Sequence, residues 1–227
     1  MSEEIYFRIL MKFAEHQGEK IEATPKARGI CLSCGENLIA KCGPKIVWHW
    51  SHRSKTICDS WWENETQWHR DWKNQFPREW QETLVADDNG NRHFADIRTP
   101  NGLVVEFQHS YLSARERQKR VKFYKRLIWV IDGKRRITDF SKFEGARKRA
   151  IGRKFGSVLY ERLNRYNSRL VDEWYGQVAA FDFGRETIWL LKNSDNNWGF
   201  GYEMEKEEFL KRIRVDQPFQ DAIFAIR

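Results

Sequence analysis

The chain has 227 residues, with 40 Lys and Arg against 32 Asp and Glu, which gives a formal net charge of +8. This length allows one domain with an appendage or two small domains, and the basic excess is compatible with a polyanionic partner. No apolar run approaches the ~18 residues of a membrane helix, and the acidic start of the chain is unlike a secretory signal. We therefore expect a cytoplasmic protein that does not span a membrane.

The first region, residues 1–60, contains all four cysteines and predicts short strands around a bound metal. Disulfides are not expected in the cytoplasm, whereas zinc prefers four sulfur or nitrogen ligands that come in two close pairs. The C-x-x-C and H-x-x-H spacings therefore predict a closed structural Zn²⁺ site made by four of five residues: Cys31, Cys34, His49, His52 and Cys58. Cys58 is the substitute for His49 in this set. The alternative is buried thiols beside unrelated histidines.

The second region, residues 61–134, predicts a helix, three strands, a helix and a strand in that order. The first helical stretch covers 65–80 and is interrupted by Pro77. The strands follow over 82–87, 93–98 and 103–108. A basic helix then leads to the fully apolar run 127–131, which is typical of a buried central strand.

The third region, residues 135–227, carries less specific patterns. Residues 142–167 predict a long basic helix, and 205–213 predict a closing helix. Three strands are expected over 177–183, 186–192 and 198–204. We expect these elements to pack on the central sheet, with a separate third domain as the alternative.

Two acids and an amide carry the clearest chemical signal. Asp96 ends the second predicted strand, and Glu106 and Gln108 lie two apart on the third, so their side chains share a face. A turn between the strands can bring Asp96 beside Glu106, where both can bind Mg²⁺ or Mn²⁺. Such a metal activates water and neutralises charge on a phosphate, with Gln108 orienting the water or a phosphate oxygen. The alternative is a polar sheet edge, which is costly where the acids are buried.

A second set of polar residues precedes these strands. Glu65, His69 and Lys73 are spaced four apart, so on a helix they line one face. Taken alone, this is a solvated charged face. Its position before the acidic strands suggests a role in the same site: Glu65 would hold a metal-bound water or a second ion, and His69 or Lys73 would supply a proton or a positive charge.

Several consecutive motifs resemble the CoiA-like competence protein family and, more broadly, the PD-(D/E)XK nuclease superfamily. The resemblance covers about residues 18–135. It rests on Cys31-x-x-Cys34, His49-Trp-Ser-His52, Cys58-Asp59, the segment from Glu63 to Lys73, Ala95-Asp96-Ile97, Glu106-Phe-Gln108-His109-Ser110, Arg120-x-x-Phe-Tyr124 and Ile128-Trp-Val-Ile-Asp132.

This resemblance implies an α/β (α+β) fold: a restriction-endonuclease-like αβββαβ core with a mixed central sheet over 61–134, preceded by a small zinc-ribbon-like module over 1–60. It also implies a Mg²⁺- or Mn²⁺-dependent nuclease that acts on DNA, rather than RNA, in uptake, recombination or repair. Gln108 stands where the superfamily has lysine, so the fixed positive charge must come from Lys73 or another cation.

Two rival hypotheses come from other classes of protein. One is a catalytically silent, zinc-containing nucleic-acid-binding module of the same fold, which the glutamine at position 108 favours. The other is a zinc-stapled interaction protein whose basic charge is incidental. Asp96, Glu106 and Gln108 together favour the enzyme, because a binding module does not need all three.

Overall fold

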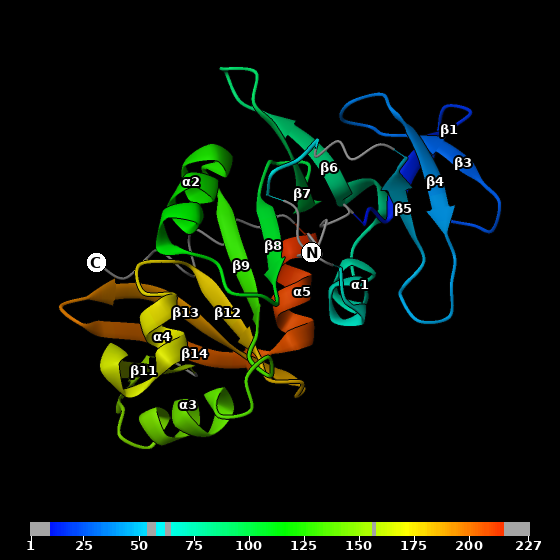
Figure 1. Cartoon of the computed structure of the whole chain (residues 1–227). Helices are drawn as coiled ribbons and strands as arrows, with labels where there is room; N and C mark the ends of the chain where they lie inside the picture. Colours follow the sequence, from blue (N-terminus) through cyan, green and yellow to red (C-terminus); the bar gives the residue numbers. More distant parts are fainter. Residues whose placement is uncertain (1–9, 54–57, 62–64, 156–157, 216–227) are drawn as a thin grey trace, which may run out of the picture. The chain divides into compact units, whose positions relative to one another are not determined.

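The computed structural model describes residues 10–53, 58–61, 65–155 and 158–215, and it divides into two units, Met1–Asp96 and Ile97–Arg227 (Figure 1). The division falls within one strand, β7. We describe each unit by itself. None of the described helices has both the length and the apolar character that crossing a membrane requires.

The first unit begins with an antiparallel sheet of short strands in the order β2-β1-β3-β4-β5. Its strands are β1 (Phe13–His16), β2 (Glu19–Glu22), β3 (Arg28–Ile30), β4 (Asn37–Lys41) and β5 (His49–His52). Met11, just before β1, forms a bridge with Trp50 of β5, so the sheet curls back on itself. This confirms the short strands predicted for the first region.

A small core holds this sheet together. Trp50 is fully buried and its indole N–H donates to the Ile21 carbonyl at 3.0 Å. Gly29 lets β3 approach β1 closely, because a Cβ at this position would lie 2.7 Å from the Cβ of Ala14. Met11, Ala14 and Leu38 complete the apolar packing around Trp50.

The rest of the first unit contains α1 (Gln67–Lys73), the 3-10 turn η1 (Arg78–Trp80), β6 (Gln81–Ala86) and most of β7 (Arg92–Arg98). The predicted helix over 65–80 is wrong in extent. Thr66 caps α1, so Glu65 lies outside the helix, and the helix ends before Pro77. The two strands predicted here are confirmed within a residue at each end.

The second unit is built on a mixed sheet in the order β10-β11-β14-β13-β12-β9-β8, with Ile97 and Arg98 of β7 paired to β8. Its strands are β8 (Val104–Gln108), β9 (Leu127–Asp132), β10 (Ile151–Phe155), β11 (Val158–Asn164), β12 (Ala179–Asp182), β13 (Thr187–Asp195) and β14 (Trp198–Glu205). Strands β8, β9 and β12 are parallel, and the other pairs are antiparallel. The predicted mixed α/β class is confirmed, and β9 is buried as expected.

The described part of this unit also contains the helical segments α2 (Ala114–Tyr124), α3 (Asp139–Arg147), η2 (Arg165–Asn167), α4 (Arg169–Glu173) and α5 (Lys206–Arg214). Helices α3 and α4 lie together over one face (Figure 1), where Phe143 and Leu170 share a core with Trp129, Trp189 and Leu163. Helix α5 contacts β13 and β14 but contributes nothing to that core, which places it on the opposite face.

The long basic helix predicted over 142–167 is wrong. The helix α3 ends at Arg147, and β10 and β11 form an antiparallel hairpin instead. The physical reason is alternation: in β11, Glu161 and Leu163 are buried, whereas Tyr160 and Arg162, which alternate with them, are half-buried. Pairing to β14 outweighs the helical preference of the Lys, Arg and Leu residues in this segment.

Candidate functional site

Four potential metal ligands converge in the first unit. The ligand atoms of Cys31, Cys34, His52 and Cys58 all lie within 4.8 Å of one another. Cys31 Sγ is 3.7 Å from Cys58 Sγ, and Cys34 Sγ is 3.2 Å from His52 Nε2. Tetrahedral zinc with bonds of about 2.3 Å to sulfur requires ligand separations of roughly 3.8 Å. This Cys3His cluster could bind a metal such as zinc.

Backbone geometry of the C-x-x-C turn positions the first two thiols. The Cys31 N–H donates to the Glu36 carbonyl at 2.8 Å, and the Gly35 N–H donates to the Cys31 carbonyl at 2.9 Å. Gly35 has a φ of 75°, which favours glycine. Both cysteine side chains are therefore fixed by a short, closed knuckle.

The thiols of the cluster differ in pKa. The hydrogen bond from Cys58 lowers the pKa of Cys31 to about 3, and the same contact raises the pKa of Cys58. Burial raises the pKa of Cys34. A thiolate is the form that binds metal, so the cluster already favours one ligand in its binding form.

His49 does not join this cluster. Its Nδ1 lies 2.8 Å from the Val47 carbonyl, and it is absent from the four convergent ligands. His49 and His52 lie three apart on β5, and residues at odd spacing on a strand point to opposite faces. Of the five predicted ligands, the structure brings together four, with Cys58 in place of His49.

Asp59 ties the cluster to the strand that bears Asp96. Its Oδ1 accepts from the Trp61 N–H at 2.9 Å and contacts His93 Nδ1 at 2.8 Å, and its Oδ2 accepts from the Phe94 N–H at 2.8 Å. The Trp61 ring stacks on His93 with centroids 3.4 Å apart. The segment that carries Cys58 is thereby attached to β7 within the first unit.

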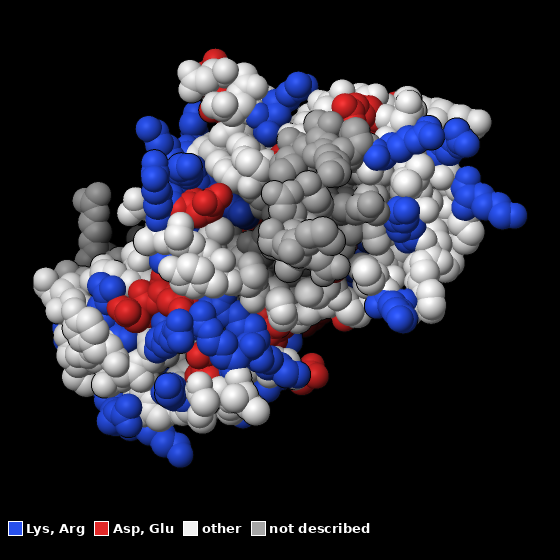
Figure 2. Space-filling view, in the orientation of Figure 1, with Lys and Arg blue, Asp and Glu red and all other residues white. Residues whose placement is uncertain are grey.

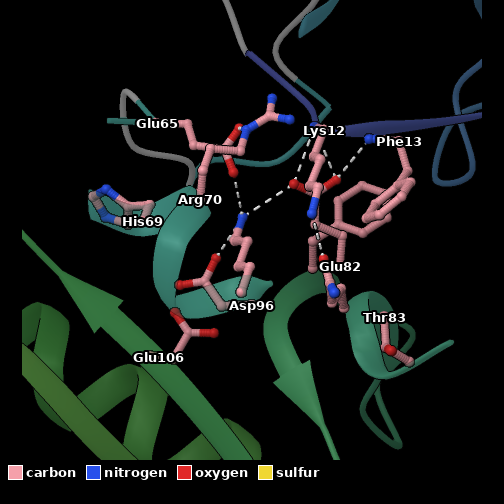
Figure 3. Close-up of polar contacts among 12 residues, drawn as sticks. Lys12, Phe13, Glu65, His69, Arg70, Glu82, Thr83, Asp96 and Glu106 are labelled. Atoms are coloured by element: carbon pink, nitrogen blue, oxygen red, sulfur yellow. Dashed lines mark hydrogen bonds and ion pairs between the residues drawn. The ribbon is translucent and has the colours of Figure 1, made fainter. Parts of the chain in front are cut away.

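A second cluster of the first unit centres on Lys73. Its ammonium lies 2.9 Å from Glu65, 3.0 Å from Glu82 and 2.9 Å from Asp96 (Figure 3). The three carboxylates come from the segment before α1, from β6 and from β7, and they point at one nitrogen. We call this group the carboxylate–lysine cluster.

The pKa values in this cluster depend on two opposing effects, burial and the charges of neighbouring side chains. Burial works to lower the pKa of Lys73, but the carboxylates of Asp96, Glu65 and Glu82 outweigh it and raise that pKa well above its usual value. Burial raises the pKa of Glu65, and Lys73 partly offsets this effect. Arg70 Nε also contacts Glu65 at 2.5 Å. Lys73 is therefore a fixed positive charge at neutral pH.

Sequence reasoning missed Glu82. Both of its carboxylate oxygens accept from the Lys12 N–H, at 3.0 and 3.1 Å, and one accepts from the Phe13 N–H at 3.1 Å (Figure 3). Its backbone has a φ of 41°, an uncommon value for a non-glycine residue. Its role depends on backbone N–H groups about 70 residues earlier in the chain, which no local pattern reveals.

His69 helps to cap helix α1, a role that its i, i+4 spacing from Glu65 and Lys73 did not predict. Its Nδ1 lies 2.9 Å from Thr66 Oγ1 and 3.3 Å from Thr66 N, so it completes a capping box at the start of α1. Because Glu65 lies outside the helix, the expected i, i+4 face is formed only by His69 and Lys73. Glu65 reaches Lys73 through the turn before α1.

The other predicted residues lie on β8 in the second unit. Glu106 is buried and its Oε2 is 3.3 Å from Arg120 Nη1 of α2. Gln108 is buried as well, and its Nε2 donates to the Ser110 carbonyl at 3.1 Å. They lie two apart on one strand, as expected.

Basic side chains gather on the second unit. Figure 2 shows Lys and Arg side chains beside α2 and near α4, with acidic side chains among them. On α2, Arg115, Lys119 and Lys122 are exposed at helical spacing. Such a row is suited to phosphate contacts, and it is also the ordinary appearance of a solvated helix face.

Comparison with known proteins finds a family similarity in the first unit. Residues 13–60 match the family model described as Competence protein CoiA, N-terminal domain. The matched segment contains Cys31, Cys34, His52 and Cys58. Neither the curated proteins nor the solved structures contain a match.

We expect His52→Ala and His49→Ala to affect metal content differently. His52→Ala removes a ligand of the Cys3His cluster, so zinc is lost and the midpoint of thermal unfolding falls, because metal binding contributes to folding. His49→Ala retains zinc. Elemental analysis of the purified variants, with thermal unfolding alongside, measures both effects. Full zinc content in His52→Ala, or zinc loss confined to His49→Ala, would contradict the assigned ligand set.

We expect Lys73→Met to destabilise the protein by about 3–5 kcal/mol near pH 8, since it leaves buried carboxylates without a counter-ion. Loss of the ammonium raises the carboxyl pKa values, so the folded variant binds more protons than the unfolded chain and its stability rises as pH falls. The difference from wild type therefore shrinks between pH 8 and pH 5.

Urea unfolding across this pH range tests the expectation, with the exposed Lys45→Met as the matched control. The control has little effect at any pH. A loss in Lys73→Met that is independent of pH would show that packing, rather than charge, holds the cluster together.

Proposed function

We propose that this chain is a CoiA-like, metal-dependent nuclease that hydrolyses DNA in the cytoplasm during uptake, recombination or repair. The observation that carries the proposal is the convergence of Glu65 and Asp96 on the ammonium of Lys73. A set of carboxylates with one fixed cation is what phosphodiester hydrolysis requires: ligands for a metal, and a charge near the phosphate.

Lys73 is the residue that replaces the missing lysine at position 108. Its raised pKa keeps it protonated, so it acts as a positive charge and does not act as a base. In this role it stabilises negative charge on the phosphate. Glu82, held by the backbone N–H groups of Lys12 and Phe13, positions the ammonium.

Asp96 and Glu106 are the residues assigned to Mg²⁺ or Mn²⁺. Asp96 lies on β7 in the first unit and Glu106 on β8 in the second unit. Their oxygen donors suit either ion, which supplies activation of water and neutralisation of phosphate charge.

A second function is favoured by a specific observation. Asp96 contacts Lys73 and Glu106 contacts Arg120, so both acids assigned to the metal have a cationic partner. Protein cations then balance the acidic charge without any ion, as in a catalytically silent nucleic-acid-binding module. The match to CoiA supports an involvement with DNA under either function.

Cleavage assays separate the two functions. Purified protein is incubated with linear, single-stranded and branched DNA, and with RNA, in Mg²⁺ or Mn²⁺. We expect DNA cleavage that falls roughly 100-fold or more in Asp96→Asn and in Glu106→Gln, since each removes a metal ligand. The exposed Asp88→Asn, from the hairpin between β6 and β7, is the matched control and retains activity.

Two outcomes would oppose the nuclease. Cleavage that persists in both Asp96→Asn and Glu106→Gln would refute the assigned acids. DNA binding without cleavage in either metal would favour the silent module.

A further inference from the structure

One face of the sheet in the second unit carries aromatic rings that the proposed nuclease site does not use. In the β11–β14 ladder, Tyr160 lies opposite Tyr202, Arg162 opposite Phe200 and Asn164 opposite Trp198. Side chains directly opposite each other project on the same face. Leu163, of the other parity, is fully buried in the core with α3 and α4. The rings therefore lie on the face away from that core.

These rings are only partly covered by the described residues. Tyr160, Trp198 and Phe200 are half-buried, whereas Tyr202 is buried where α5 packs on β14. The Tyr160 and Tyr202 rings have centroids 5.1 Å apart. Adjacent strands thus present a row of flat apolar surfaces that is bounded on one side by α5.

Two cations lie among the rings and have no acidic partner among the residues that the structure describes. The Arg162 guanidinium lies 4.5 Å from the Trp198 ring centroid and 5.4 Å from that of Phe200, and Lys192 Nζ lies 5.9 Å from that of Tyr160. Within the described part of the chain, Arg162 Nε and Lys192 Nζ have no hydrogen-bond partner, and neither side chain forms an ion pair. Lys192 is only 9% exposed, so its unpaired ammonium is costly.

On the opposite face of the same strands, charged side chains have partners within the protein. Glu161 accepts from Arg147 Nε at 2.8 Å and from the Trp189 indole N–H at 2.7 Å. Charges on the α3 side are thus paired within the protein. Among the described residues, Arg162 and Lys192 on the aromatic side have no such acidic partner, and an anion from outside can satisfy buried donors of this kind.

We propose that this aromatic face, made of Tyr160, Arg162, Lys192, Trp198, Phe200 and Tyr202, binds single-stranded DNA. Unpaired bases can stack on the rings, and the phosphates provide the negative charge that Arg162 and Lys192 lack. A duplex hides its base faces, and an apolar peptide brings no anion. The choice of DNA rests on the proposed function, but the binding itself needs no cleavage and no divalent metal.

Fluorescence anisotropy tests the proposal with the full chain and no added divalent metal. The probes are a labelled oligothymidine, the duplex of the same length, and an oligouridine. We expect the oligothymidine to bind roughly 10-fold more tightly than the duplex, and Trp198→Ala to weaken it roughly 10-fold, as for loss of one stacked base. Tyr166→Ala, which removes a ring that is 70% exposed outside this face, leaves the affinity unchanged.

Lys192→Met tests the same face in a variant that is expected to fold, in case Trp198→Ala does not. It replaces a buried, unpaired ammonium with an apolar side chain of similar length, so thermal stability is kept or raised while affinity for oligothymidine falls several-fold. Arg162→Lys keeps the charge but loses the planar stacking, and it weakens binding as well.

Several results would overturn the proposal. Equal affinity for duplex and single strand, or binding unaffected by Lys192→Met and Trp198→Ala, would mean that charge elsewhere holds the DNA. Tighter binding of oligouridine would assign the face to RNA. A change of oligomeric state in these variants, measured by light scattering without DNA, would assign it to a second copy of the chain. Loss of cleavage in Asp96→Asn leaves this binding intact, so the two proposals fail separately.

Discussion

The first unit depends on one buried ammonium. Lys73 neutralises carboxylates from three separate segments, and no one of them could be buried beside the others without it. Removing charges from water is expensive, so such a cluster persists only when its geometry is nearly complete. Here Arg70 forms an ion pair with the second oxygen of Glu65, and the Lys12 N–H donates to the second oxygen of Glu82. The positions of α1, β6 and β7 are therefore coupled through a single charge.

The segment that carries Cys58 and the ammonium of Lys73 both contact β7, the first through Asp59 and the second through Asp96. Asp59, next to the potential metal ligand Cys58, accepts from the N–H of Phe94 near the start of β7. Lys73 contacts Asp96, two residues after Phe94 on the same strand. A Cys3His cluster this small can fold a short segment that has little core of its own. Within the first unit, the metal cluster thus contributes to the placement of an acid that the proposed chemistry uses.

The sequence predicts correctly those elements whose structure depends on residues that are close together in the chain. The strands that bear Asp96 and Glu106 could be predicted because alternation and apolar runs report strands directly. The H-x-x-H spacing alone could not decide between His49 and Cys58, because residues three apart on a strand point to opposite faces. Glu82 could not be predicted, because its role depends on backbone donors 70 residues earlier. The β10–β11 hairpin was missed because its pairing with β14 overrides a helical composition.

The internal pairing of the acids has a consequence for how the proposed nuclease would handle its metal. A carboxylate that already contacts lysine or arginine must share or exchange that contact before it can bind an ion, so metal affinity is reduced by the strength of the contact. The same cations attract phosphate. In the proposed nuclease, a phosphodiester at Lys73 or Arg120 would compete for the cation and would release the carboxylate oxygens. Substrate and metal would then favour each other's binding, which keeps the ion out of the site until DNA is present.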